Sequence, residues 1–218
     1  GEPFDAAAWP GLDIVVIRNT APRGFGANHN AAFAHCKAPW FAVLNPDLRL
    51  PSDPFERLVE TAAALEHPGA VAPRVVDSAG RDEDAVRTNL TPWSVLCRKL
   101  DRDAGRARDA TRSGGREFFW LAGMFLLVSA DAWRQVGGFD ERFFLYCEDY
   151  DLCARLDRAG CQLAVDRSVA AVHDAQRDSR RSPRHLRWHV GSLLRVWTSS
   201  AFWWVSCVRP LRRRPRHG

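Results

Sequence analysis

The 218-residue chain has little of what marks small secreted or zinc-binding domains. Its six cysteines form no Cys-x-x-Cys pair and have no histidines at zinc-ligand spacing, which argues against a structural zinc site. No signal peptide is visible at its start, so we expect reduced thiols and a cytoplasmic protein rather than a disulfide framework. No internal repeat and no low-complexity linker is visible, so we expect one domain over residues 1–186 and a helical tail over 187–218.

Acidic residues are also scarce near the end of the chain. From Arg177 onward there are eleven arginines and one aspartate, although the whole chain carries a net charge of only +5. The preceding body is therefore acidic, which argues against a broad nucleic-acid-binding surface. An acidic body with a basic tail instead fits a carboxylate-bearing active site and a tail that meets anionic surfaces.

The tail sets tryptophans among these arginines, and Val190–Val208 is largely apolar. This stretch contains Arg195 and is marginal for a spanning helix, which needs about 20 mostly apolar residues. Two alternatives remain open. The tail is either an interfacial helix on the anionic inner face of a membrane, or a helix that packs on the body or on a second subunit of a homo-oligomer.

Strand and helix patterns alternate along the body. The β-branched run Leu12–Ile17 and the apolar runs 40–44 and 70–76 predict buried strands, with helices at about 27–37 and 54–65. This alternation predicts a doubly wound, mainly parallel α/β sheet flanked by helices, with ligands at the carboxyl ends of its strands. Further along we expect an apolar segment at 118–128, a helix capped by Ser129, strands at 162–165 and 170–172, and a mobile loop at 101–116.

The most distinctive segment is Gly137–Arg155, which reads GGFDERFFLYCEDYDLCAR and combines two glycines, five carboxylates and several aromatics. The glycines predict a tight turn with positive φ, and the residues around Leu152 predict an amphipathic helix. Asp149 is therefore expected at a loop-to-helix junction, where its carboxylate can face a cleft and accept a proton. Plain capping of the helix by acidic residues is the alternative.

This segment resembles the acceptor-side signature of the family-2 glycosyltransferases, especially their bacterial rhamnosyltransferase-like branch. Two further segments match that family in the same order: Arg23–Asn30 (RGFGANHN) is similar to its donor-side loop, and Leu44–Asp47 (LNPD) to its metal-site turn. The resemblance covers about residues 12–190 and implies a GT-A-like fold. It also implies inverting transfer of a sugar, such as rhamnose, from a nucleoside-diphosphate donor to a hydroxyl of a cell-surface glycan or lipid-linked acceptor.

The resemblance assigns roles residue by residue. The catalytic base falls on Asp149, beside Glu148. A divalent cation, Mg²⁺ or Mn²⁺, would be held by Asp47 with His173, and a single direct carboxylate contact is expected because Asn45 stands where a full Asp-x-Asp motif begins. The expected donor-binding residues are Arg23, Gly24, Asn28, Asn30, Asn45 and Asp47, and the expected acceptor-binding residues are Trp120, Gly123, Met124, Phe144 and Tyr146.

Several of these residues have a structural alternative. Asn-Pro-Asp is often a plain turn, Asn28 and Asn30 can satisfy the start of a helix, His173 can be a structural histidine, and Trp120 can pack in the core. The alternative functions are a catalytically incomplete relative that binds a glycan or a partner, and a peripheral membrane or nucleic-acid-binding protein whose arginine tail carries the binding.

The start of the chain bears on the donor site. Members of the resembled family normally begin with another strand and helix, which supply part of the nucleotide-base pocket. Only the short segment Glu2–Pro10 precedes the match here. We therefore expect a truncation, a fragment or a divergent member, in which donor binding is affected.

Overall fold

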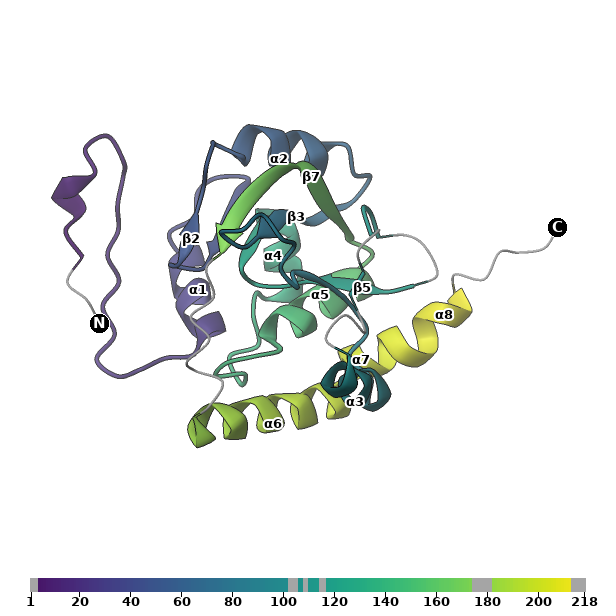
Figure 1. The fold of residues 1–218 in the computed structure, drawn as a ribbon. Helices are drawn as coiled ribbons and strands as arrows, with labels where there is room; N and C mark the ends of the chain where they lie inside the picture. The colour runs from purple at the N-terminus through teal and green to yellow at the C-terminus, as the bar shows by residue number, and fades with distance from the viewer. Residues whose placement is uncertain (1–3, 102–105, 108–109, 114–116, 174–181, 213–218) are drawn as a thin grey trace.

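A computed structural model describes residues 4–101, 106–107, 110–113, 117–173 and 182–212 (Figure 1). The loop expected at 101–116 lies largely outside these residues, as do the arginines that follow Arg212. A five-stranded sheet runs through the body in the order β1, β6, β3, β7 and β2, and a two-stranded sheet is formed by β4 and β5. The strands are β1 (Trp40–Leu44), β2 (Leu48–Arg49), β3 (Pro68–Val76), β4 (Val86–Thr88), β5 (Phe119–Leu121), β6 (Phe125–Ser129) and β7 (Gln162–His173).

Helices precede, separate and follow these strands. The expected helix behind Ser129 is confirmed, because the Ser129 side chain accepts a hydrogen bond from the N–H of Ala132. The helices are η1 (Ala6–Ala8), α1 (Phe25–Phe33), α2 (Phe55–Ala63), α3 (Pro92–Leu100), α4 (Ala130–Val136), α5 (Glu148–Arg158), α6 (Pro183–Thr198), α7 (Ser200–Trp203), the π-helical turn η3 (Trp204–Val208) and α8 (Arg209–Arg212).

The α/β class expected from the sequence is confirmed, but the sheet is mixed rather than mainly parallel. β3 and β7 pair in parallel, whereas β1 with β6, β6 with β3, and β7 with β2 pair antiparallel. Alternating strands and helices predict parallel crossovers, but β6 follows β5 through the short turn 122–124 instead of a helix. β6 lies between β1 and β3 and runs opposite to both.

Helices cover both faces of the sheet because successive side chains of a strand point to opposite faces. Phe125 and Leu127 of β6 lie in a core with Leu58 of α2. Leu126 and Val128 lie in the larger core on the other face, which contains buried residues of α4, α5 and the C-terminal helices. The helix that carries the acidic segment is thus packed directly on the sheet.

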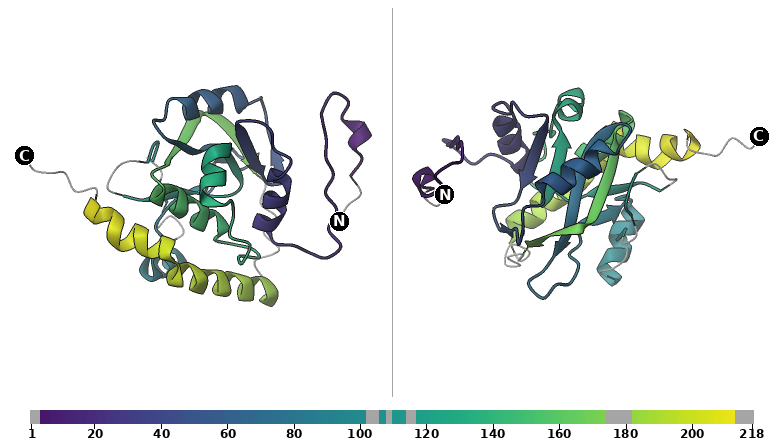
Figure 2. Two further views of the ribbon diagram at one scale, coloured as in Figure 1. Left: turned by 180° about the vertical axis from the view of Figure 1, so that it is seen from behind. Right: turned by 90° about the horizontal axis from the view of Figure 1, so that it is seen from above.

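The segment Leu12–Ile17 forms no strand, so this prediction was wrong. Leu12 and Val15 are exposed, and the segment stands apart from the sheet (Figures 1 and 2). A β-branched run forms a strand only where a neighbouring strand takes up its backbone hydrogen bonds. Among the described residues β1 pairs with β6 alone, and Leu12–Ile17 does not pair with the other edge of β1.

The C-terminal helices α6 to α8 pack along one edge of the body, at the bottom of Figure 1. Leu193, Val196, Phe202 and Val205 are buried in the larger core, so one side of these helices packs on the body. No helix in the described part of the chain is both long and apolar enough to cross a membrane.

Arg209, which the sequence places in the basic tail, is a buried core residue. Its Nε lies 3.1 and 3.0 Å from the two carboxylate oxygens of Asp157 on α5, and both side chains are 1% exposed. The Trp204 indole N–H donates to the same carboxylate at 3.3 Å, and the Arg209 guanidinium lies over the Phe118 ring. A buried charge pair therefore joins the C-terminal helices to α5.

We predict that Arg209→Ala lowers the free energy of unfolding by about 3–5 kcal/mol, because it leaves the Asp157 carboxylate buried without its counter-charge. Arg212→Ala is the matched control, since Arg212 is exposed and lies over the Trp204 ring; it should cost less than about 1 kcal/mol. Urea denaturation followed by circular dichroism measures both. Equal losses in the two variants would contradict the role of the pair.

Candidate functional site

The carboxyl end of β1 and the turn before β6 bring the sequence motifs together. The backbone N–H of Asn45 donates to the carbonyl of Met124 at 2.9 Å. The N–H of the preceding residue, Gly123, donates to the Asp149 carboxylate at 2.9 Å. A Cβ on Gly123 would lie 3.3 Å from the Phe25 ring, a tight contact, and 3.5 Å from the Asp149 Cβ, so Gly123 is closely packed between α1 and α5.

Asp149 lies in the first turn of α5, as expected for the loop-to-helix junction. Its second carboxylate oxygen accepts from the N–H of Tyr150 at 2.8 Å. Burial raises the pKa of Asp149, while the hydrogen bond from Gly123, the charge of Arg87 and the hydrogen bond from Tyr150 oppose the rise. The carboxylate is thus fixed in position and made more basic than an exposed aspartate.

Glu148 precedes it and is 6% exposed. Its Oε2 is buried and has no hydrogen-bond partner among the described residues. Burial, together with the neighbouring Asp149 charge, raises the pKa of Glu148 to about 8. Each carboxyl group of the pair therefore holds a proton more tightly than an exposed one, and the charge of Asp149 further disfavours ionisation of Glu148.

The loop before α5 holds an unusual backbone. Gly137 and Gly138 have φ of 76° and 67°, which confirms the tight turn that the sequence predicts. Tyr146 and Cys147 also have positive φ, 73° and 64°, although neither is glycine. Left-handed non-glycine residues cost energy and gather at functional sites.

The expected acceptor residues Phe144 and Tyr146 of this loop contact α6. The ring of Phe144 stacks on Trp188 with centroids 4.7 Å apart. The Tyr146 hydroxyl lies 2.8 Å from Nδ1 of His185. The C-terminal helices therefore help to shape the region in front of α5.

Trp120, also expected to bind acceptor, is 3% exposed and packs edge-on against the ring of Tyr150. Its indole N–H donates to the carbonyl of Thr88 on β4. Trp120 has the core-packing role that the sequence leaves open as the alternative.

The two expected metal ligands lie side by side. β2 pairs with β7 so that Leu48 is opposite His173, which brings Nε2 of His173 to 3.3 Å from a carboxylate oxygen of Asp47. Nδ1 of His173 is buried and has no hydrogen-bond partner among the described residues. The part of the chain that the structure describes holds no group of three or more His, Cys, Asp or Glu side chains suited to a metal. One carboxylate and one imidazole fit a cation whose remaining ligands come from a diphosphate and water.

The donor-side loop, Arg23–Asn30, contacts the loop 137–147 before α5, called here the acceptor-side loop, through backbone atoms. The N–H of Phe25 donates to the carbonyl of Phe144 at 3.0 Å, and a Cβ on Gly24 would lie 2.6 Å from that oxygen. Only glycine fits at this contact.

The other donor-side residues make contacts of their own. The side chain of Asn30 accepts a hydrogen bond from the N–H of Phe139 and donates to the Phe139 carbonyl and the Glu141 carboxylate. Asn30 therefore connects α1 to the acidic segment. Arg23 pairs with Glu141 at 3.3 Å, and the Asn28 side chain accepts from Asn19.

Sequence reasoning missed two residues near this site. His29 on α1 has its Nδ1 3.0 Å from the carbonyl of Phe25. Burial lowers the pKa of His29, while hydrogen bonds to the backbone of Phe25 and of Leu44, at the end of β1, partly offset this effect. Arg87 lies over the Trp120 ring at 5.2 Å and favours the charged form of Asp149. Neighbouring motif residues signal His29, but β4 carries no motif that signals Arg87.

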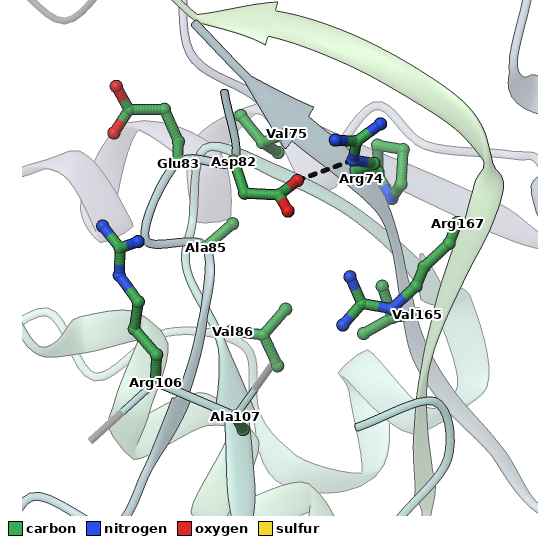
Figure 3. A pocket seen from close by; sticks show the side chains of 11 residues that line it. Arg74, Val75, Asp82, Glu83, Ala85, Val86, Arg106, Ala107, Val165 and Arg167 are labelled. Carbon is green, nitrogen blue, oxygen red and sulfur yellow. Dashed lines mark hydrogen bonds and ion pairs between the residues drawn. The ribbon is translucent and has the colours of Figure 1, made fainter. Parts of the chain in front are cut away.

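Two surface depressions lie elsewhere and are not lined by Asp149 or Asp47. One is lined by residues of β3, β4 and β7, with Arg74, Arg106 and Arg167 around a volume of about 30 Å³; Figure 3 shows the ion pair of Arg74 with Asp82. This is room for about one water molecule. The other, about 470 Å³, lies between α5 and the C-terminal helices.

Comparison with known proteins places these residues in a family. Residues 4–191 match the family described as "Glycosyltransferase like family 2". The chain is 29% identical over 189 residues to N-acetylglucosaminyl-diphospho-decaprenol L-rhamnosyltransferase of Mycobacterium tuberculosis, covering 78% of this chain and 59% of that protein. It is 28% identical over 197 residues to rhamnosyltransferase WbbL of Escherichia coli K12, covering 86% of this chain and 74% of that protein. The chain thus spans less than two thirds of the length of the mycobacterial relative.

Among solved structures, the fold is similar to that of a mannosyltransferase from Pyrobaculum calidifontis in complex with GDP-Man and Mn²⁺. The TM-score is 0.56 at 15% identity, over 94% of this chain and 56% of that one. This likeness shows the GT-A fold. Because the family match includes the donor-side loop, the Asp47 turn, the Glu148–Asp149 pair and His173, the chain belongs to glycosyltransferase family 2.

Proposed function

We propose that this chain is the catalytic part of an inverting glycosyltransferase that moves a sugar from a nucleoside diphosphate to an acceptor hydroxyl. The observation that carries the proposal is the buried Glu148–Asp149 pair, in which Asp149 is aimed by the Gly123 amide at the edge of the sheet where Asp47 and His173 also meet. When two carboxyl groups share one proton, the ionised group can act as a general base near neutral pH.

In this mechanism the Asp149 carboxylate removes the proton of the acceptor hydroxyl. The acceptor oxygen forms its bond to the anomeric carbon while the bond from that carbon to the diphosphate breaks, so the configuration inverts. The proton stays on Asp149 and the nucleoside diphosphate leaves. Proton transfer to a positioned base typically contributes about 10²–10⁴-fold to the rate.

Glu148 supports this step by staying protonated. A second negative charge beside Asp149 would repel the electron-rich oxygen of the acceptor, and burial of Glu148 prevents that charge from forming near neutral pH. Asp47 and His173 would hold Mg²⁺ or Mn²⁺, which neutralises the charge of a departing diphosphate. Arg23, Asn28 and Asn45 remain the proposed donor contacts.

The relatives suggest the substrates. Both curated relatives are named as rhamnosyltransferases, and the mycobacterial one is named for a diphospho-decaprenol, a lipid-linked sugar carrier. We therefore favour a dTDP-rhamnose-like donor and a lipid-linked acceptor, which would place the protein at the inner face of a membrane. A relative that binds a glycan without transferring sugar is the second candidate, favoured only by the unpaired edge of β1 among the described residues.

Asp149→Asn should lower the transfer rate by about 10²-fold or more while leaving nucleotide affinity nearly unchanged, because the amide keeps the shape but cannot accept the proton. Release of nucleoside diphosphate measures the rate, and calorimetry measures binding. The matched control is Asp131→Asn, an exposed aspartate on α4, which should retain full activity. Full activity in Asp149→Asn would overturn the mechanism.

The cation site is tested by calorimetric binding of dTDP, UDP and GDP with and without Mn²⁺. We expect dTDP to bind more tightly when Mn²⁺ is present, and the Mn²⁺ effect to disappear in Asp47→Ala and in His173→Ala. Asp131→Ala should leave it intact. Nucleotide affinity that does not depend on Mn²⁺ in the native protein would contradict a cation at this site.

The buried Glu148 also predicts a pH dependence of stability. Because its folded pKa is raised to about 8, the folded state holds a proton that the unfolded chain releases at lower pH. This stabilisation is fully present below the unfolded pKa of about 4.3 and is lost as the pH rises through about 8. Denaturation midpoints should therefore fall from pH 6 to pH 9 in the native protein and fall less in Glu148→Gln. The same decrease in both proteins would show that Glu148 does not hold the proton.

A further inference from the structure

The short helix α3 presents an apolar side to solvent. Trp93, Leu96 and Leu100 are spaced three and four residues apart and are 72%, 49% and 86% exposed, so they form one stripe along α3. Val95 on another side of the helix packs against the larger core. A folded protein gains nothing from this exposure in water, and exposed apolar stripes mark interaction sites.

α6 carries a second such stripe. Leu186, Val190 and Leu194 follow at four-residue spacing and are all exposed, whereas Leu193 and Val196 of the same helix are buried against the body. The apolar side chains therefore lie on a flank of α6 and not on its packed side.

The segment just before α3 is hydrogen-bonded to the C-terminal helices. Trp197 lies two turns beyond Val190 and thus on the same flank of α6, and its indole N–H donates to the carbonyl of Leu90, just before α3. The Asn89 amide donates to Ser206 of η3 at 2.9 Å, which also fixes the start of α3 to the C-terminal helices. In Figures 1 and 2 (left), α3 and α6 both lie at the lower edge of the molecule.

The charged side chains within these helices have one sign. Neither α3 nor the segment 182–212 contains an Asp or Glu, although the exposed Asp101 follows Leu100 directly, and Arg184, Arg187 and Arg212 are exposed along the C-terminal helices. Five of the nine tryptophans, Trp93, Trp188, Trp197, Trp203 and Trp204, belong to these elements. Exposed aliphatic side chains, tryptophans and arginines without acidic neighbours are typical of helices that lie in a membrane interface.

From these observations we infer that α3 and α6 form a single docking face for an anionic lipid leaflet, made of Trp93, Leu96, Leu100, Leu186, Val190 and Leu194. This inference rests on the proposed function, because it supplies the surface on which a lipid-linked acceptor is met. It adds α3, a helix far from the tail in sequence, to the membrane-binding elements.

A lipid leaflet fits this face better than a second copy of the chain. A two-fold dimer through this face would set its arginines against the same arginines of the other copy with no acidic partner in these helices. Anionic headgroups satisfy the arginines and acyl chains accept the aliphatic side chains in one plane.

The docking face is linked to the acceptor-side loop through α6. The opposite flank of α6 contacts that loop through Trp188 on Phe144 and through Arg195, whose guanidinium lies over the Phe143 ring. The Ser192 hydroxyl donates to the carbonyl of Leu145 at 2.9 Å. Docking of α6 on a leaflet therefore sets the position of residues 143–146 relative to the membrane surface, where the sugar of a lipid-linked acceptor lies.

The test is co-sedimentation of the full chain with vesicles of phosphatidylcholine alone and of equimolar phosphatidylcholine and phosphatidylglycerol. We expect binding to the anionic vesicles that falls by about tenfold or more in Leu186→Gln/Val190→Gln/Leu194→Gln and in Trp93→Gln/Leu96→Gln. The matched control is Leu12→Gln/Val15→Gln, which removes two equally exposed apolar side chains outside the face and should bind as the native chain does.

Three results would overturn the inference. They are no vesicle binding by the native chain, equal loss in the control, and wild-type vesicle binding in the face variants. In the last case, a change from dimer to monomer in analytical ultracentrifugation would show that the face joins two copies of the chain. Separate assays distinguish failure of this inference from failure of the proposed function. Asp149→Asn should keep native vesicle binding, and the face variants should keep native transfer to a lipid-free acceptor, so each hypothesis fails in its own assay.

Discussion

The hydrogen bond from the Gly123 amide to the Asp149 carboxylate is the contact on which the site depends. It joins the β5–β6 turn to the first turn of α5, and the neighbouring Asn45–Met124 hydrogen bond joins the same turn to the end of β1. Three segments that are far apart in sequence are thereby held at one edge of the sheet. Because a backbone amide cannot rotate away as a side chain can, the orientation of the carboxylate follows from the strand pairing itself.

Much of this site was predictable because its residues sit in short motifs with strong local signals. Glycines at 137 and 138, the acidic pair before Leu152 and the Asn-Pro-Asp turn each specify local backbone, and the structure brings the segments together. The strand pairing was less predictable, since the direction of β6 depends on the turn before it. The Leu12–Ile17 run shows the limit of propensity, because a strand also needs a neighbour to receive its hydrogen bonds.

The C-terminal helices show why composition alone does not reveal which charged residues are buried. Arg209 lies three residues before the exposed Arg212, yet it is buried in a pair with Asp157, some fifty residues earlier. Only the packing of η3 and α8 on α5 separates the two arginines, and such long-range contacts leave no periodic signal in the sequence. On α6, Trp188 and His185 contact Phe144 and Tyr146, so the helices that look like a tail pack against the loop before α5.

The contact of Gly24 with the Phe144 carbonyl has an evolutionary consequence. The donor-side and acceptor-side loops touch through backbone atoms, with no side chain between them to absorb a change in either. A change that moves one loop therefore also moves the other. Under the roles proposed for the two loops, a substitution that adapts the donor side would shift the acceptor side as well, so the two preferences would change together during divergence.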